Sequence, residues 1–299
     1  MIKNTLLKAA LLLTIATPAG AFEIAEIIDS TKIGTRFSFE ADFDKSDSSL
    51  SYNQTYFGTF INQPIKFADD WTFFNYFSAE RTQINLKGSH FYGSASDDLE
   101  SDLYNISLPL AVIKNSATSK WTYGFWVNPT IASDFSHLDG DDFFLDLGAG
   151  VGYRYSDDLL IGLGVYASDV TKDAGIIGGP GFIWTPCDQW LISFYGPRFL
   201  ARYHLSERSQ IGFEIASRGG KWNLDADDQS RKAYLQNWQS GLYLRQNVYK
   251  KLWVQIGAGY SFAQKLELTD REGDRFLDNN DGDADGSPYV YLSFDVAKW

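Results

Sequence analysis

The feature that most constrains the fold of this chain is an alternation of apolar with small or polar residues at a period of two. It is clearest over residues 142–155. One face of that segment takes Phe143, Leu145, Leu147, Ala149, Val151, Tyr153 and Tyr155, and the other takes Asp146, Gly148, Gly150, Gly152 and Arg154. Because successive side chains of a strand point to opposite faces, the pattern predicts a strand with one apolar face.

The alternation recurs along most of the sequence and predicts about fourteen strands. The other segments lie at 33–43, 52–61, 71–80, 102–113, 121–132, 159–166, 181–186, 189–195, 198–205, 209–217, 234–247, 252–262 and 288–298. Two of them, 189–195 and 198–205, are shorter than the ~9–11 residues of a tilted spanning strand. If these two form one strand, the count becomes thirteen, and restoring an even number elsewhere gives twelve. Pro109 and Pro129 fall inside strand patterns and predict bulges.

The hydropathy of the chain excludes a helical membrane protein but leaves a membrane barrel open. After residue 21 no stretch approaches the ~18–20 apolar residues of a spanning helix. A sheet can cross lipid only as a closed barrel, because every backbone polar group must be paired. The sequence therefore predicts an all-β fold, a transmembrane antiparallel up-and-down β-barrel of the Gram-negative outer membrane. A soluble exported β-sandwich is the rival architecture.

The first residues have the pattern of a secretory signal peptide. Lys3 and Lys8 precede an apolar run at 9–16, and Ala19-Gly20-Ala21 supplies the small-x-small cleavage pattern. We expect residues 1–21 to be the signal peptide and residues 22–299 to be a single barrel domain. This organisation implies export through the inner membrane and localisation in the outer membrane.

The connections between the predicted strands alternate in length, as in outer-membrane barrels with short periplasmic turns and long external loops. Short turns are expected at 156–158, 186–188, 206–208 and 249–251, and long loops at 81–101, 133–141, 167–180, 218–233 and 263–287. Four tryptophans, Trp71, Trp121, Trp190 and Trp253, each fall just after a connection predicted to lie at the periplasmic end. Because an indole settles where hydrocarbon meets water, they predict an aromatic girdle at that end.

The net charge limits the classes of binding partner, and the cysteine count limits disulfide bonding. The formal charge is −12, and removal of the two leader lysines leaves about −14. An acidic chain repels nucleic acid, so no nucleic-acid partner is expected. The partners implied are outer-membrane lipids and the barrel-assembly machinery during insertion, with the oligomeric state left open. The single cysteine, Cys187, excludes an intramolecular disulfide.

Three stretches in the middle of the chain resemble an uncharacterised family of outer-membrane β-barrel proteins known only as a domain of unknown function. They are LPLAVIKNSATSKWTYGFWVNPTIASDF at 108–135, YSDDLLIGLGVYAS at 155–168 and GGPGFIWTPCDQWLISFYGPRFLARYHLSERSQIGFEI at 178–215. The resemblance covers roughly half of the chain and rests on turns, glycines and tryptophan positions. It implies a barrel in the outer membrane and supplies no activity or functional residues.

One motif suggests a metal. Asp281, Asp283 and Asp285 match the D-x-D-x-D-G start of a calcium loop, in which alternate carboxylates converge and glycine allows the turn that follows. The twelfth position is Leu292 where a bidentate glutamate is expected, so the motif is incomplete. A solvated acidic external loop is the alternative interpretation, and calcium binding is a hypothesis. No other cofactor is implied.

Charged residues on the polar parity predict a lumen lining. The candidates are Arg36, Glu40, Arg154, Arg198, Arg202, Glu214 and Arg245. Such charges can line a selective pore or can pair and close it. Fourteen strands at ~4.8 Å spacing and ~40° tilt give a backbone radius of roughly 14 Å, which leaves space for water.

These observations favour a passive porin-like channel for small or hydrophobic solutes. One alternative is a non-transporting structural or adhesive barrel with acidic external loops. Another is a lipid-modifying barrel enzyme, for which His90, His137 and His204 are the only histidines. Neighbouring residues of a strand face opposite sides, so adjacent Ser–His pairs are no evidence of catalysis. The sequence therefore predicts no enzyme and no catalytic residues.

Overall fold

The structure is a computed structural model. It describes residues 32–44, 51–68, 70–87, 99–116, 118–168, 176–226, 229–270, 283–284 and 286–297. The predicted signal peptide lies outside these residues, as do Asp281 and Asp285. Within the described ranges, no helix is long and apolar enough to span a membrane.

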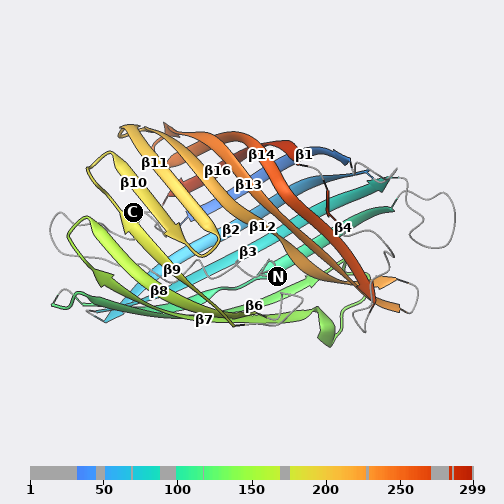
Figure 1. Ribbon diagram of the computed structural model, residues 1–299, viewed down its shortest axis with the longest axis horizontal. Coiled ribbons are helices and arrows are strands. Elements are labelled where there is room, and N and C mark those ends of the chain that lie inside the picture. The colour runs from blue at the N-terminus through green and yellow to red at the C-terminus, as the bar shows by residue number, and fades with distance from the viewer. Residues whose placement is uncertain are drawn as a thin grey trace.

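Strands make up nearly all of the described chain (Figure 1). In the first half they are β1 Lys32–Asp44, β2 Ser51–Ala68, β3 Trp71–Lys87, β4 Leu99–Ser107, β5 Leu110–Asn115, β6 Trp121–Ser133, β7 Phe143–Arg154 and β8 Leu159–Ser168. In the second half they are β9 Ile176–Trp184, β10 Trp190–Tyr195, β11 Arg198–Ser206, β12 Ser209–Ala226, β13 Gln229–Tyr249, β14 Leu252–Asp270, β15 Asp283–Ala284 and β16 Ser287–Ala297. One 3-10 turn, η3 Gly140–Asp142, precedes β7.

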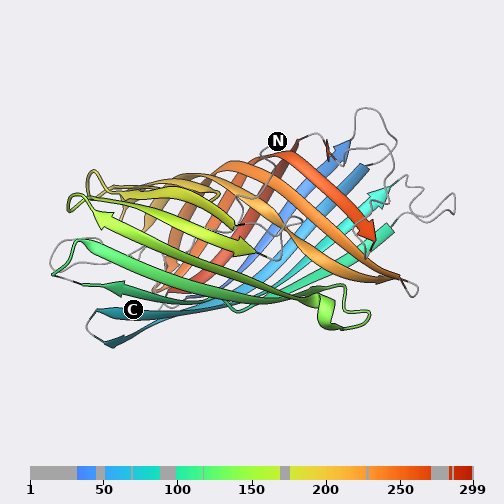
Figure 2. The same cartoon turned by 60° about the horizontal axis from the view of Figure 1, so that its bottom comes forward.

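The strands close into an antiparallel barrel, which confirms the predicted fold. Neighbours in the sequence pair in order around the ring, β14 pairs with β16, and β16 pairs with β1. β4 and β5 share one position between β3 and β6. With β15 a two-residue piece beside β14, the described strands occupy fourteen positions. The strands run obliquely to the long axis and wrap around it (Figures 1 and 2).

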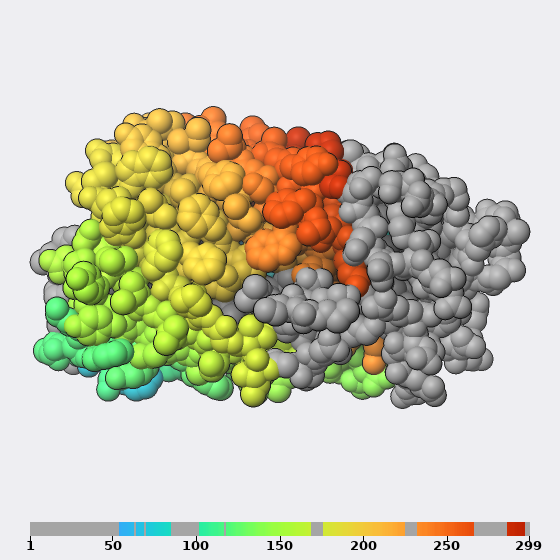
Figure 3. All heavy atoms as spheres, in the orientation of Figure 1, coloured from blue at the N-terminus to red at the C-terminus, as the bar shows by residue number. Residues whose placement is uncertain are grey.

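The barrel is apolar outside and largely polar inside. Exposed large apolar side chains alternate along the strands, for example Leu163 and Val165 on β8 and Ile256 on β14. The outer surface formed by β10 to β14 is continuous in Figure 3. The opposite parity carries buried polar residues, such as Ser193 and Ser261. Because water-soluble folds bury apolar and expose polar side chains, this reversal is what a lipid-facing wall around a polar interior requires.

The two short strands are separate, so the alternative in which they form one strand is wrong. β10 and β11 pair from Trp190↔Tyr203 to Tyr195↔Arg198, joined by a tight turn at Gly196 and Pro197. Pro109 lies in the break between β4 and β5, but the pairing register with β3 and β6 is the same on both sides of the break, so the predicted bulge is absent. Pro129 does not interrupt β6, which continues through it to Ser133.

The predicted long loop at 218–233 is wrong. β12 and β13 continue as one hairpin from Ser209↔Gln246 to Ala226↔Gln229, so only residues 227–228 connect them. Polar residues such as Arg218 and Lys221 made the segment look like a loop, but a paired hairpin keeps its backbone hydrogen bonds whatever side chains it carries. Its end contacts the opposite wall, where Asn223 pairs with Ser133 and accepts from Asp134 N at 3.3 Å.

The wall between β9 and β12 is only partly paired. The pairing of β10 with β9 ends at Tyr195↔Gly181, so among the described residues Ile176–Pro180 pairs with β8 alone. The pairing of β11 with β12 ends at Arg198↔Ala216, and Ser217 N donates to Pro197 O at 3.1 Å in the adjoining turn. Among the described residues, the edge of β12 at 218–222 therefore pairs with β13 alone. β12 to β14 extend beyond β8 to β11 along the barrel (Figure 1).

Three of the four tryptophans of the predicted girdle are exposed near the short turns, with Trp71, Trp121 and Trp190 showing 37–48% of their surface. Trp253 does not belong to the girdle, because it has the inward parity of Gln255 and lies under the Arg245 guanidinium at 4.8 Å. Trp184, at the end of β9, is exposed at the same end of the barrel and was not predicted.

Candidate functional site: the inner wall of the barrel

An aromatic row crosses the inner wall. Phe74, Ala111, Trp126, Gly148, Tyr166 and Ile177 stand opposite one another on successive strands from β3 to β9. Apart from Ile177 its side chains are buried, and the Trp126 and Tyr166 rings stack at 5.5 Å. A side chain at position 148 would overlap the Trp126 indole, so glycine is required there. Cross-strand pairing thus places an apolar band on the inner wall, and a second buried apolar cluster, which includes Ile183, Leu191 and Leu200, lies further around it.

Bare backbone lies directly next to this row. Seven inward glycines fill two adjacent cross-strand rows, which are Gly124–Gly150–Gly164–Gly179 and Gly152–Gly162–Gly181. We call these seven residues the glycine patch. Among the described residues, a Cβ at Gly179 would meet no atom within 4 Å, and one at Gly164 would meet only the Ala149 carbonyl at 3.6 Å. These two glycines therefore face open space.

Inward glycines on the other side of the barrel are covered. The rings of Tyr243, Tyr289 and Tyr291 lie over glycines of neighbouring strands, and added side chains at Gly212, Gly241 or Gly257 would overlap them. The glycines let these rings lie along the wall instead of pointing to the axis. Large inward side chains here thus take less of the lumen than their size suggests.

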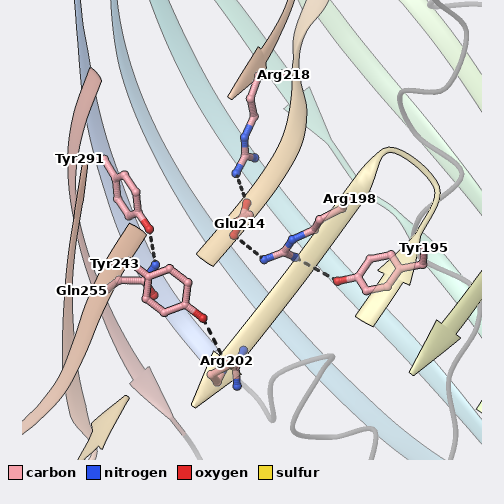
Figure 4. Close-up of polar contacts among 8 residues, drawn as sticks. All are labelled: Tyr195, Arg198, Arg202, Glu214, Arg218, Tyr243, Gln255 and Tyr291. Atoms are coloured by element: carbon pink, nitrogen blue, oxygen red, sulfur yellow. Dashed lines mark hydrogen bonds and ion pairs between the residues drawn. The ribbon is translucent and has the colours of Figure 1, made fainter. Parts of the chain in front are cut away.

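A charged cluster stands beside the glycine patch. Figure 4 shows Glu214 of β12 held between two arginines, with Arg198 Nη2 at 2.9 Å and Arg218 Nη2 at 3.1 Å. Arg198 Nη1 also donates to Tyr195 Oη at 3.1 Å. We call Arg198, Glu214 and Arg218 the arginine bracket. It holds two positive charges against one negative charge, and the carboxylate is the most covered member.

The position of the bracket follows from the strand register. Gly181 pairs with Tyr195, Tyr195 with Arg198 and Arg198 with Ala216. The row that contains Gly181 therefore continues around the wall into the bracket. Tyr195 and Arg198 also flank the turn that ends the β10–β11 hairpin. The bracket therefore stands where the pairing between β9 and β12 stops.

The other predicted lumen charges are tied into the wall. Arg245 pairs with Asp295 at 2.7 Å, and both side chains are 8% exposed. Arg202 Nε donates to Tyr243 Oη at 3.3 Å, and Arg154 Nη2 donates to Asn115 at 3.4 Å. The backbone of Arg36 and Glu40 lies on β1, but their side chains are outside the described residues. The structure brings Arg198 and Glu214 together and leaves Arg154 and Arg245 apart from them.

Two groups in the wall were missed by sequence reasoning. Arg218 was assigned to a loop, although it continues the even, inward parity of Glu214 and Ala216. Asp146, which is fully buried, accepts from Asn128 Nδ2 at 3.1 Å and from the Ser168 hydroxyl. Its inward parity was visible in the sequence, but its partners on β6 and β8 depend on the register.

The metal and catalytic hypotheses gain no site in the described residues. These residues hold no group of three or more His, Cys, Asp or Glu side chains able to bind a metal. Of the predicted calcium ligands only the backbone of Asp283 is described, in β15. Ser136, next to His137, donates its hydroxyl to Asp134 at 2.9 Å in an ordinary turn.

Some inward polar atoms have no hydrogen-bond partner in the described protein. They include Thr130 Oγ1, Ser193 Oγ, Gln210 Oε1 and Ser261 Oγ, and their side chains are at most 8% exposed. A polar atom left without a partner in a dry interior is destabilising, whereas one that faces water is satisfied. Because these atoms are themselves buried, only a water molecule held within the wall can satisfy them, and they give no evidence of an open lumen.

Comparison with known proteins gives a family. Residues 80–297 match the profile of a family described as Domain of unknown function (DUF6268). A search of curated protein sequences gives no match.

Several solved structures are similar in outline. An outer-membrane channel from Pseudomonas putida F1 is 12% identical, with 96% of this chain and 97% of that chain covered at a TM-score of 0.48. A FadL homologue from Pseudomonas aeruginosa is 10% identical, with 89% and 90% covered at 0.46. The toluene transporter TodX of P. putida is 10% identical, with 95% and 93% covered at 0.43. Similarity of this size says nothing about what the present chain binds.

Proposed function

Since the chain belongs to the DUF6268 family, whose description gives no activity, we propose a function from the geometry: a passive channel for small solutes in the Gram-negative outer membrane. The observation that carries this proposal is the glycine patch. Seven neighbouring inward positions without side chains remove material from one side of the lumen, and Gly179 faces open space.

The rest of the wall supports passage of water and solutes. Fourteen strand positions give a backbone radius of roughly 14 Å, too wide for the wall's own side chains to fill when large rings lie flat. The aromatic row next to the glycine patch offers an apolar surface as well, which favours solutes with an apolar part.

The outward face supports placement in a membrane. On β3 the outward residues run from Trp71 through Phe77 before Arg81 is reached, where the exposed guanidinium binds Asp102 at 2.7 Å. Ten residues of β3, Trp71–Glu80, precede that charge, and the polar one among their outward side chains is the amide of Asn75. This length fits the ~9–11 residues of a strand that crosses the hydrocarbon. We place the short turns in the periplasm and the longer connections outside, with export by the signal peptide at 1–21.

The proposal is tested by solute flux. Purified protein is inserted into lipid vesicles, and osmotic swelling is followed with small neutral solutes. Wild type should swell rapidly, and Gly179→Trp should swell several-fold more slowly because the indole enters the open part of the lumen. The matched control is Gly178→Trp on the outward face of the same strand, where tryptophan meets lipid and flux should stay at the wild-type rate. Equal swelling of folded wild type and protein-free vesicles would reject the channel.

A further inference from the structure

We propose that the arginine bracket binds the carboxylate of an organic acid whose compact apolar body, such as an aromatic ring, lies over the glycine patch. This inference rests on the proposed channel function and names the class of solute that the channel favours.

The charge balance of the bracket points to an anion. Two guanidiniums share one carboxylate, so the cluster keeps one net positive charge inside a chain whose net charge is −12. Glu214 is 16% exposed, whereas Arg198 and Arg218 are 37% and 41% exposed. The positive groups are thus the accessible ones. An approaching solute meets cations first.

The hydrogen-bond geometry points to a carboxylate. Each guanidinium has five N–H donors in a fixed plane. Glu214 and Tyr195 accept only part of those of Arg198, and among the described residues Arg218 donates to Glu214 alone. A planar carboxylate matches the remaining forked donors of an arginine better than a spherical anion does.

The surroundings provide a place for the apolar body. The row that contains Arg198 leads through Tyr195 to Gly181 and the rest of the glycine patch, and two strand spacings cover about 10 Å. Tyr195 is 9% exposed, and its ring lies 6.0 Å from the Arg198 guanidinium carbon. A molecule with its carboxylate on the bracket can lay an apolar body against bare backbone next to the aromatic row.

Substitution of Glu214 distinguishes anion binding by the bracket from a purely structural role. If the bracket only holds β11 against β12, removal of either the carboxylate or an arginine disrupts the same contact. If it binds anions, Glu214 competes with the ligand for the guanidiniums. Glu214→Gln should then strengthen binding while Arg218→Gln weakens it.

The experiment is calorimetric titration of the full-length folded barrel in detergent micelles with benzoate, with benzyl alcohol as the uncharged probe of the same shape. We expect benzoate to bind more tightly than the alcohol. Arg198→Gln and Arg218→Gln should each weaken benzoate about tenfold, in line with the loss of one charge-assisted bond. Glu214→Gln should strengthen it several-fold. The matched control Arg81→Gln, which removes a positive charge from the outer surface, should leave the affinity unchanged.

The outcomes separate this inference from the channel itself. Equal weakening by Glu214→Gln and Arg218→Gln, or equal affinity for benzoate and benzyl alcohol, overturns the bracket as a carboxylate site. If Arg198→Gln does not fold, the test still stands, because Arg218→Gln should lower the benzoate affinity and Glu214→Gln should raise it. Benzoate binding without vesicle flux would reject the channel and support the carboxylate site. Flux without benzoate binding would support the channel and reject the carboxylate site.

Discussion

Two sides of the barrel use inward glycine in opposite ways. On β12 to β16, glycine lies beneath tyrosine rings that fold onto the wall, and β13 pairs with β12 and β14 along nearly all of its 21 residues. On β6 to β9, glycine forms a patch whose members at 164 and 179 face open space, and β9 and β12 are partly unpaired. The first side is built for packing, whereas the second leaves room.

The comparison teaches that glycine content alone does not report an open lumen. The sequence shows inward glycines on both sides, and only the rings from neighbouring strands distinguish covered from bare positions. Stability and passage are therefore expected to depend on different sides of the molecule, and the following variants test that division.

The largest expected effect is on the packed side, at the buried ion pair. Asp295→Ala leaves Arg245 buried without its partner and should destabilise the barrel by about 3–5 kcal/mol. Urea unfolding in vesicles measures this. Arg81→Ala, which breaks the exposed pair with Asp102, should change stability by no more than about 1 kcal/mol. Equal effects of the two variants would show that the inner pair is solvated like a surface pair.

The next effect compares glycines on the two sides. Gly257→Ala places a methyl group against the Tyr291 ring, which is fixed by its bond to Gln255, and should destabilise by about 1–3 kcal/mol. Gly164→Ala meets open space and should be neutral or stabilise by up to about 1 kcal/mol, because alanine restricts the unfolded chain. The same unfolding assay reports both. A similar loss at both positions would erase the distinction between the two sides.

The smallest effect concerns the turn that joins β7 to β8 on the open side. The Ser156 hydroxyl, then backbone N–H and the Trp184 indole, hold the pKa of Asp158 below its ordinary value of 3.8. A depressed pKa stabilises the folded state above that ordinary value, and the gain is lost as the pH falls through the folded-state pKa. The unfolding midpoint should therefore fall less between about pH 5 and pH 2 in Asp158→Asn than in wild type. An identical fall in both would show that the turn contributes nothing.

Alternation along single strands could be predicted from the sequence, because it depends only on which way neighbouring side chains point. The outward parity of Leu145, the inward parity of Arg198 and the closed antiparallel barrel follow from it. The separation of β10 from β11 needed the structure, because Gly196-Pro197 can end a strand or bend one. The long β12–β13 hairpin was missed because its polar side chains resemble those of a loop.

The candidate site was less predictable, because it depends on register between strands. Arg198 and Glu214 were both expected on the lumen side, but nothing in the sequence puts them opposite each other, and Arg218 was assigned elsewhere. Trp253 was expected at the membrane interface and instead packs under Arg245. The aromatic row draws one residue from each of several strands, so it cannot be read from any single segment.

The claim on which the account depends is that the two faces of each strand meet different solvents, lipid outside and water inside. Single cysteines on β8 test it directly in a Cys187→Ser background, with a water-soluble maleimide added to protein in vesicles. Gly164→Cys should react rapidly, while Leu163→Cys and Val165→Cys should be protected until the barrel is unfolded. Equal reactivity at all three positions, or protection of position 164 alone, would contradict the account.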